Sequence, residues 1–189
     1  MKKRVFIAIN LPTETKDELG QLLKKLKKIN PQQQIRYVKA DSLHLTLHFL
    51  GDRGAEEIST IKKVMRDIAS SHSPSTIITG DIDAFPNLQS PKVVYLSIME
   101  KPKSSISSLQ KKLGFTLEQA GIDVDHRAWQ PHLTLARINS PTVFKTQNAF
   151  PPIIEIPATH ITLMESNLTS YGAQYTVLES FSFSNHGQN

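Results

Sequence analysis

The sequence predicts an α+β protein of two pseudo-symmetric lobes, each an antiparallel sheet with helices on its outer face, and a cleft between the lobes. Three observations favour this fold class. Short apolar runs typical of strands alternate with amphipathic helical patterns along the 189 residues. No low-complexity segment divides the chain, so we expect one bilobal domain over residues 1–189. The letters H-L-T-L occur twice, starting at His44 and at His132, with about half of the chain between them.

The N-terminal part predicts a strand, a helix and two further strands. The helix should begin after Thr13, which we expect to cap it, and end before Pro31, because its leucines recur three and four positions apart. The strand that carries the first H-L-T-L should end at Gly51. The predicted strands cover residues 5–9, 35–38 and 43–50.

The rest of the chain predicts two more helices and five more strands. The third helix should begin at Pro102 and end at Gly121, the residue types that favour these positions. Residues 141–157 show no pattern that we can assign, and from about residue 184 we expect a flexible tail. The second helix is predicted around residues 58–68, and four strands at 76–82, 93–98, 160–168 and 175–183. The fifth strand opens with Pro131 and carries the second H-L-T-L.

Composition limits the classes of function. The chain has no cysteine and a formal charge of +5, so it must fold without disulfides and should attract polyanions. No apolar run is long enough to span a membrane, and the N-terminus lacks an export signal. We therefore expect a cytoplasmic protein with polyanionic partners and no membrane partner, and we also expect a monomer.

The repeated motif predicts a phosphate site. Side chains alternate along a strand, so His44 and Thr46 share one face, with Cβ atoms roughly 7 Å apart, while the leucines enter the core. His132 and Thr134 repeat this arrangement. If the two strands lie close together, two imidazoles and two hydroxyls converge on one polar spot that suits a phosphate.

Two histidines suit the opening of a cyclic phosphodiester. One imidazole can accept a proton from water while the other gives a proton to the departing oxygen, because the pKa of histidine lies near neutrality. Threonine hydroxyls can donate hydrogen bonds to the phosphate oxygens that gain charge. This chemistry needs no metal ion. The sequence contains no glycine-rich phosphate loop, so we expect no nucleotide cofactor.

Segments spread along the whole chain extend this reading to a family. The chain resembles the 2H phosphoesterase superfamily, and in particular its RNA 2′,3′-cyclic phosphodiesterases, also called 2′-5′ RNA ligase-like proteins. The matching segments are R-V-F-I-A-I at 4–9 with L-P at 11–12, R-Y-V at 36–38, L-H-L-T-L-H-F-L-G at 43–51, W-Q-P-H-L-T-L-A-R at 129–137, E-S at 165–166 and Y-G-A-Q-Y at 171–175.

The resemblance implies that the two motifs face each other across the cleft and that a 2′,3′-cyclic phosphate is hydrolysed to a 2′-phosphate. It implies His44 and His132 as the catalytic pair, without assigning acid or base, and Thr46 and Thr134 as phosphate ligands. It also suggests Arg137 near the substrate, although strict alternation would turn Arg137 away from His132 unless a bulge or the end of the strand intervenes. The partners that it implies are RNA ends or cyclic nucleotides as substrate. An ATP-independent 2′-5′ RNA ligase and a non-catalytic RNA-binding module remain alternatives.

Other residues near the motifs have plainer interpretations. By alternation His48 shares the face of His44 and could attract substrate, whereas Phe49 turns toward the core. His44 and His48 lack the third ligand that a hydrolytic zinc site needs, so we expect no metal. His160-Ile161-Thr162-Leu163 fits a looser form of the motif, and we expect His160 to be a hydrogen-bonded core residue.

Overall fold

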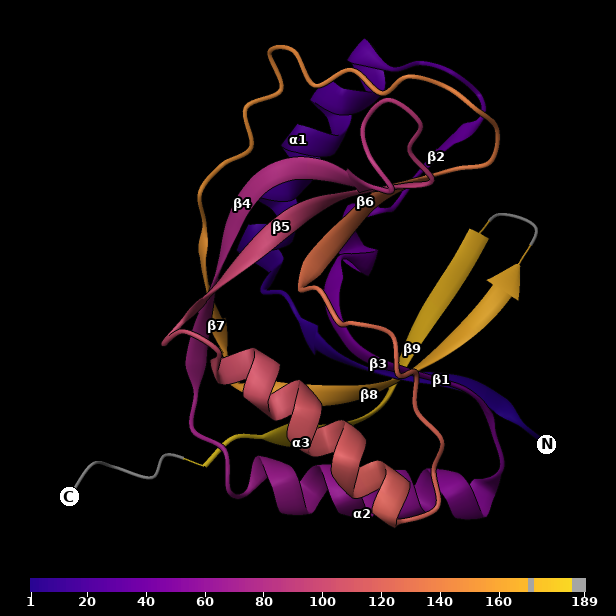
Figure 1. Cartoon of the computed structure of the whole chain (residues 1–189), viewed down its shortest axis with the longest axis vertical. Helices are drawn as coiled ribbons and strands as arrows, with labels where there is room; N and C mark the ends of the chain where they lie inside the picture. The colour runs from indigo at the N-terminus through magenta and orange to yellow at the C-terminus, as the bar shows by residue number, and fades with distance from the viewer. Residues whose placement is uncertain (170–171, 185–189) are drawn as a thin grey trace.

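The chain folds as three helices against one strongly curled antiparallel sheet, seen in the computed structural model, which describes residues 1–169 and 172–184 (Figure 1). The α+β class is confirmed. The elements are β1 (Lys3–Asn10), α1 (Thr13–Ile29), β2 (Ile35–Tyr37), the 3-10 helix η1 (Ala40–Ser42), β3 (His44–Arg53), α2 (Ala55–Ala69), β4 (Ser75–Phe85), β5 (Val93–Lys101), α3 (Ser105–Gln119), β6 (His132–Ile138), β7 (Glu155–Ala158), β8 (His160–Thr169) and β9 (Gly172–Ser182).

The sheet consists of two groups of strands that meet at the motif strands. Its order is β7-β4-β5-β6-β3-β1-β8-β9, with β2 also paired to β6. Only one registered pair, Leu45 with Leu133, joins β3 to β6, so the sheet can bend sharply there. Helix α1 lies with the β6 group, because Tyr37 of β2 donates a hydrogen bond to the carbonyl of Leu26. Helix α2 contacts β8 and β9 of the other group, and α3 contacts both β3 and β5. The pseudo-symmetry of the two groups stays a prediction.

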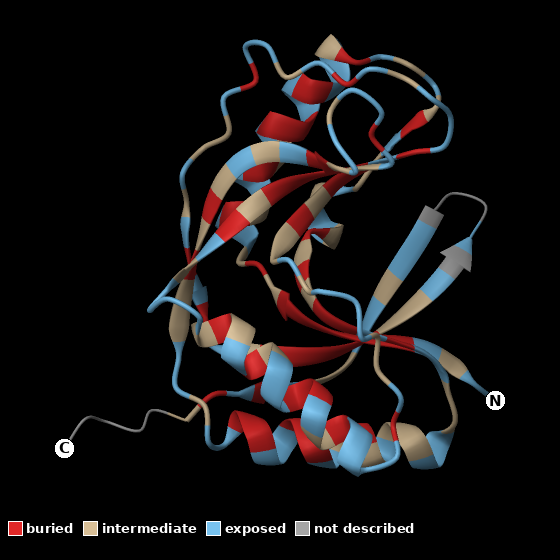
Figure 2. Cartoon of the chain, viewed as in Figure 1, coloured by how far each residue is buried: buried red, intermediate tan, exposed pale blue. Residues whose placement is uncertain are grey.

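Buried residues, red in Figure 2, lie along the strands and on the helices, and the apolar ones form the main core. The predicted leucine stripe of α1 is buried, with Leu19, Leu22, Leu23 and Leu26 all at most 7% exposed. Burying each such side chain contributes roughly 1.5–3 kcal/mol to folding, so the apolar face fixes α1 against the sheet. No helix in the described part of the chain is long and apolar enough to cross a membrane.

Two helix starts differ from the prediction. The residue before α1 is Pro12, so Thr13 is already helical and no side chain caps this end. Helix α3 begins three residues after Pro102, with Ser104 at its N-cap. The Glu100 carboxylate, at the end of β5, accepts hydrogen bonds from the backbone N–H groups of Ile106 and Ser107 at 2.9 and 3.0 Å. A strand residue therefore does the work of a helix cap.

Gly51 does not end its strand. It lies within β3 at a φ of +72°, where the register with β1 shifts by one residue, and the strand continues to Arg53. A positive φ at such a bulge favours glycine. The predicted end of α3 is correct, because Gly121 follows the helix with a φ of +79°.

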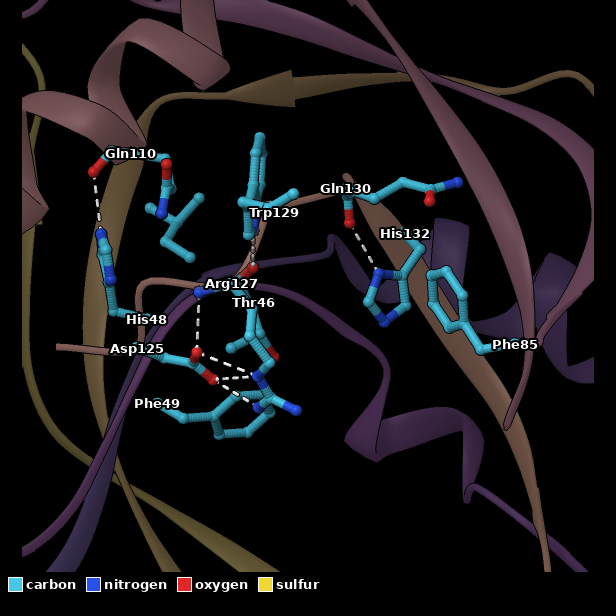
Figure 3. Close-up of a pocket in the computed structure, with 12 residues that line it drawn as sticks. Thr46, His48, Phe49, Phe85, Gln110, Asp125, Arg127, Trp129, Gln130 and His132 are labelled. Carbon is cyan, nitrogen blue, oxygen red and sulfur yellow. Dashed lines mark hydrogen bonds and ion pairs between the residues drawn. The ribbon is translucent and has the colours of Figure 1, made fainter. Parts of the chain in front are cut away.

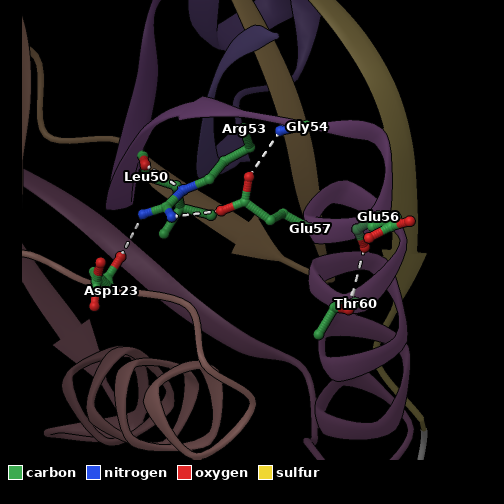
Figure 4. Close-up of polar contacts among 7 residues, drawn as sticks. All are labelled: Leu50, Arg53, Gly54, Glu56, Glu57, Thr60 and Asp123. Atoms are coloured by element: carbon green, nitrogen blue, oxygen red, sulfur yellow. Dashed lines mark hydrogen bonds and ion pairs between the residues drawn. The ribbon is translucent and has the colours of Figure 1, made fainter. Parts of the chain in front are cut away.

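Arg53 ties the end of β3 to two other elements (Figure 4). Its guanidinium donates to the carbonyls of Leu50 at 2.7 Å and Asp123 at 2.9 Å, and it pairs with the Glu57 carboxylate of α2 at 2.8 Å. Glu57 also accepts the backbone N–H of Gly54 at the start of α2. These contacts join Asp123, the first residue of the segment 123–131 that follows α3, to the end of β3.

The unassigned region at 141–157 contains one strand that the sequence did not reveal. Strand β7 pairs with the edge of β4 and includes Pro157, opposite Thr76. Four residues with a proline give no recognisable period, although proline is tolerated on an edge strand. Residues 185–189 of the predicted tail lie outside the described residues, and Ser184 donates its backbone N–H to Ala69.

Candidate functional site

The pairing of β3 with β6 brings the two motifs together. Leu45 lies opposite Leu133, and both leucines are buried in the core. In the register of that antiparallel pair, His44 comes opposite Thr134, and Thr46 comes opposite His132. Because neighbours of a core residue along a strand point the other way, all four polar side chains leave the sheet on the same face. The structure therefore places each histidine beside the threonine of the other motif.

Both histidines are oriented in the same way. The Nδ1 of His44 donates to the carbonyl of Ser42 at 2.7 Å, and the Nδ1 of His132 donates to the carbonyl of Gln130 at 2.7 Å. Ser42 is the last residue of η1, while Gln130 lies in the 123–131 segment. A neutral imidazole that donates from Nδ1 keeps its lone pair at Nε2. Each ring thus offers Nε2 as a proton acceptor.

Aromatic rings enclose both imidazoles. The His44 ring lies 4.9 Å from Phe6 and 5.1 Å from Tyr175, between ring centroids. The His132 ring lies 5.2 Å from both Phe85 and Tyr95. These contacts restrict ring rotation and remove water from the imidazoles.

Burial is the main cause of lowered pKa values at both histidines. It lowers the pKa of His44 to about 4, opposed by the hydrogen bond to Ser42 and reinforced by the positive charges of Lys16, Arg137 and His132. Burial and the charge of Arg137 also lower the pKa of His132, opposed by the hydrogen bond to Gln130. Both imidazoles are therefore neutral at pH 7 in the free protein.

The lowered pKa of His44 predicts a loss of stability in acid. Between pH 6.5 and about 4 the unfolded chain binds a proton at this histidine that the folded chain does not. The free energy of unfolding should thus fall across this window as the pH drops, by at most about 3 kcal/mol from His44. Urea unfolding at pH 7, 5 and 4 should show a smaller decrease in His44→Asn, whose side-chain amide can still donate to Ser42. Parallel decreases in the two proteins would contradict the lowered pKa.

A bulge at Leu47 reverses the alternation of β3. Strand β1 pairs Ala8 with Thr46 and Ile7 with His48, so Leu47 has no partner. Ile7 belongs to the core, and His48 therefore points into the core as well. Phe49 pairs with Phe6, whose ring contacts His44, so Phe49 turns to the motif face and is 54% exposed. The predicted orientations of His48 and Phe49 are both wrong, because the bulge exchanges them.

His48 is held against α3. Its Nε2 donates to the carbonyl of Gln110 at 2.8 Å, and only 4% of the residue is exposed. A Cβ atom at position 114 would lie 2.9 Å from the His48 ring, so the helix approaches this closely only because residue 114 is glycine. Burial lowers the pKa of His48. A contact between His48 and substrate stays a prediction.

A matching bulge at Leu135 turns Arg137 toward the motif. Strand β5 pairs Tyr95 with Thr134 and Val94 with Ala136, which leaves Leu135 without a partner. Arg137 then lies opposite Val93, which is two residues from Tyr95 and shares its face. Of the two possibilities that the sequence left open, a bulge or a strand end, the structure contains a bulge, and Arg137 shares the face of His132 and Thr134.

A cavity of about 270 Å³ lies between the motif strands and the 123–131 segment (Figure 3). Trp129 forms one wall and donates its indole N–H to the carbonyl of Thr46 at 3.0 Å. His132 and Phe85 lie at one end, and His48 and Gln110 lie at the other. The cavity adjoins Thr46 and His132 of the two motifs and has aromatic walls, a lining that suits a nucleoside.

Sequence reasoning missed the residues that support His132. The side-chain amide of Gln130, whose carbonyl accepts from His132, donates to the Tyr95 hydroxyl at 3.1 Å. That hydroxyl donates to the Asp83 carboxylate at 3.3 Å. These residues come from β4, β5 and the 123–131 segment, and no local pattern connects them. Among these residues, only Gln130 could be linked to His132 from the sequence, because it lies two residues before that histidine.

The third motif-like stretch lies elsewhere. Thr162 is fully buried in β8, where its hydroxyl lies 3.1 Å from that of Ser180. The Nδ1 of His160 lies 3.1 Å from the Thr159 hydroxyl, so the predicted hydrogen bonding is present. The predicted core position is wrong, because His160 is only partly buried. Among the described residues, no three side chains of His, Cys, Asp or Glu gather as they would around a metal ion.

Comparisons with known proteins find relatives that match nearly the whole chain. The family model "LigT like Phosphoesterase" matches residues 9–95. An RNA 2′,3′-cyclic phosphodiesterase of Methanothermobacter thermautotrophicus is 30% identical over 189 residues, covering 96% of this chain and 99% of that protein. The protein of the same name from Escherichia coli is 31% identical over 177 residues, or 94% of each. The crystal structure of E. coli LigT complexed with 3′-AMP matches with a TM-score of 0.79 at 28% identity, over 98% of this chain and 100% of that one.

Proposed function

The chain belongs to the LigT-like phosphoesterases of the 2H superfamily, and on that premise we propose that it hydrolyses 2′,3′-cyclic phosphates at RNA ends to 2′-phosphates. The observation that carries this proposal is the crossed arrangement of the motifs, in which each histidine lies beside the threonine of the other strand. The relatives named RNA 2′,3′-cyclic phosphodiesterase support the reaction class.

The proposed reaction needs one neutral and one protonated imidazole. The neutral histidine accepts a proton at Nε2 from a water molecule as the water oxygen attacks phosphorus. The bond from phosphorus to O3′ breaks, and the second histidine, as imidazolium, gives its proton to O3′. The anionic phosphate favours protonation of one imidazole despite the lowered pKa values of both in the free protein.

Three further groups act on the phosphate in this proposal. The hydroxyls of Thr46 and Thr134 donate hydrogen bonds to the non-bridging oxygens, where negative charge increases in the transition state. Arg137, on the same face, offsets that charge. All groups that the reaction needs come from the protein, so the proposed reaction is independent of metal ions. The cytoplasmic location and the monomeric state remain predictions.

A short RNA that ends in a 2′,3′-cyclic phosphate tests the proposal. We expect conversion to a 2′-phosphate product, identified by ³¹P NMR, with a bell-shaped dependence of rate on pH and the same rate in EDTA. A 5′-hydroxyl RNA added to the same reaction would reveal 2′-5′ ligation, which uses the same residues in reverse. Absence of any product, or a rate that depends on added metal, would contradict the proposal.

A further inference from the structure

Two arginines lie directly opposite each other beside the motif. Arg36 of β2 pairs in register with Arg137 of β6, so the two side chains leave the same face of the sheet. That face is the one of His132 and Thr134, because Arg137 also lies opposite Val93 of β5. Both arginines are exposed. The face of the catalytic pair therefore continues into a doubly positive edge.

This pair lacks the partners that arginines have elsewhere in the chain. Like charges directly opposite in a sheet repel each other. Among the residues that the structure describes, neither guanidinium forms an ion pair or a hydrogen bond. Three of the other four arginines do pair with carboxylates, namely Arg53, Arg66 and Arg127. An unscreened pair of guanidinium groups is a ready site for phosphate oxygens, which arginine binds through two parallel hydrogen bonds.

The two arginines differ in their distance from the chemistry. Arg137 is close enough to lower the pKa of both His44 and His132, whereas Arg36 affects neither. Arg137 can therefore reach the phosphate that reacts. Arg36 lies one strand further along the same face, where a second anionic group of a longer substrate would pass.

We propose that Arg36 binds the phosphodiester on the 5′ side of the terminal nucleotide, while Arg137 binds the cyclic phosphate. The inference rests on the proposed function and names its substrate class. The site then prefers RNA ends of two or more nucleotides to 2′,3′-cyclic mononucleotides, because a mononucleotide has no second phosphate for Arg36.

Two substrates with the same terminal base test this assignment. One is a dinucleotide that ends in a 2′,3′-cyclic phosphate, and the other is the nucleoside 2′,3′-cyclic phosphate alone. Arg36→Ala should lower kcat/KM for the dinucleotide about 10-fold, chiefly through KM, because a charged hydrogen bond is lost. Activity on the mononucleotide should change less than about 2-fold, since its only phosphate is bound elsewhere. Arg36→Lys should retain part of the effect, because it keeps the charge without the planar guanidinium.

Arg66→Ala is the matched control. Arg66 is an exposed arginine of α2, away from the motif face, and it pairs with Glu179 of β9. Both substrates should therefore react with Arg66→Ala as they do with the unchanged protein. Loss of activity in Arg36→Ala that is equal for the two substrates, or no loss with the dinucleotide, would overturn the assignment. An unchanged protein that hydrolyses neither substrate would instead refute the proposed function. Thermal unfolding of each variant shows whether the fold is intact.

Discussion

Replacing either His44 or His132 by alanine is expected to lower kcat for an RNA 2′,3′-cyclic phosphate by about 10²–10⁴-fold, the range typical of losing a general acid or base. Each imidazole presents Nε2 on the shared face and is fixed by a 2.7 Å hydrogen bond from Nδ1. Because one proton must be accepted and another donated in the same step, neither histidine can replace the other. The double variant should thus be hardly worse than either single one.

The measurement is kcat as a function of pH for each variant. Each single variant should lose one side of the bell-shaped profile, which assigns the acid and the base. His160→Ala is the control, because His160 belongs to the third motif-like stretch in β8 and its ring nitrogen contacts only Thr159 among the described residues. Full activity in either His44→Ala or His132→Ala would contradict the two-histidine mechanism.

Removing either threonine hydroxyl should have the next largest effect. Thr46→Val and Thr134→Val keep the side-chain shape and remove one donor to the phosphate, and losing such a donor typically costs 10²–10³ in kcat. In the register of the Leu45–Leu133 pair, each hydroxyl lies beside the histidine of the other motif. We expect kcat to fall while KM changes little, since the hydrogen bonds strengthen as charge builds up in the transition state.

Serine at each position separates the hydroxyl from the methyl group. Thr46→Ser and Thr134→Ser should keep most of the activity. Thr162→Val removes a buried hydroxyl whose one hydrogen bond among the described residues is to Ser180, so it should lower stability without lowering kcat. If the serine variants lose as much activity as the valine variants, the hydroxyls do not act on the phosphate.

The elements of the fold were largely predictable because their signals are local. The leucine stripe of α1 and the strand-like runs at 160–168 and 175–183 each depend on signals within one segment, and the structure confirms the helix and both strands. Features that depend on a second segment were not predictable. Glu100 caps α3 from the end of β5, and β7 exists only because β4 offers it an edge.

The same distinction applies to the candidate site. The motif places His44, Thr46, His132 and Thr134 on one face, and the structure brings these four together as predicted. Strict alternation predicts the wrong faces for His48 and Phe49, which follow Thr46 in the same strand. The reason is the bulge at Leu47, which depends on the pairing of β3 with β1. The role that the family pattern suggests for Arg137 needs either a bulge or a strand end before it, and the pairing of β5 with β6 contains a bulge.

The twin bulges at Leu47 and Leu135 each add one residue that has no partner on the neighbouring strand. Deletion of either leucine would leave the flanking pairs in regular register, so the side chains that follow would keep their faces. Insertion of one more residue after the bulge would instead turn the following side chains to the opposite side of the sheet. Shortening the strand of Arg137 by its bulge residue is therefore expected to disturb the face of that side chain less than lengthening the same strand.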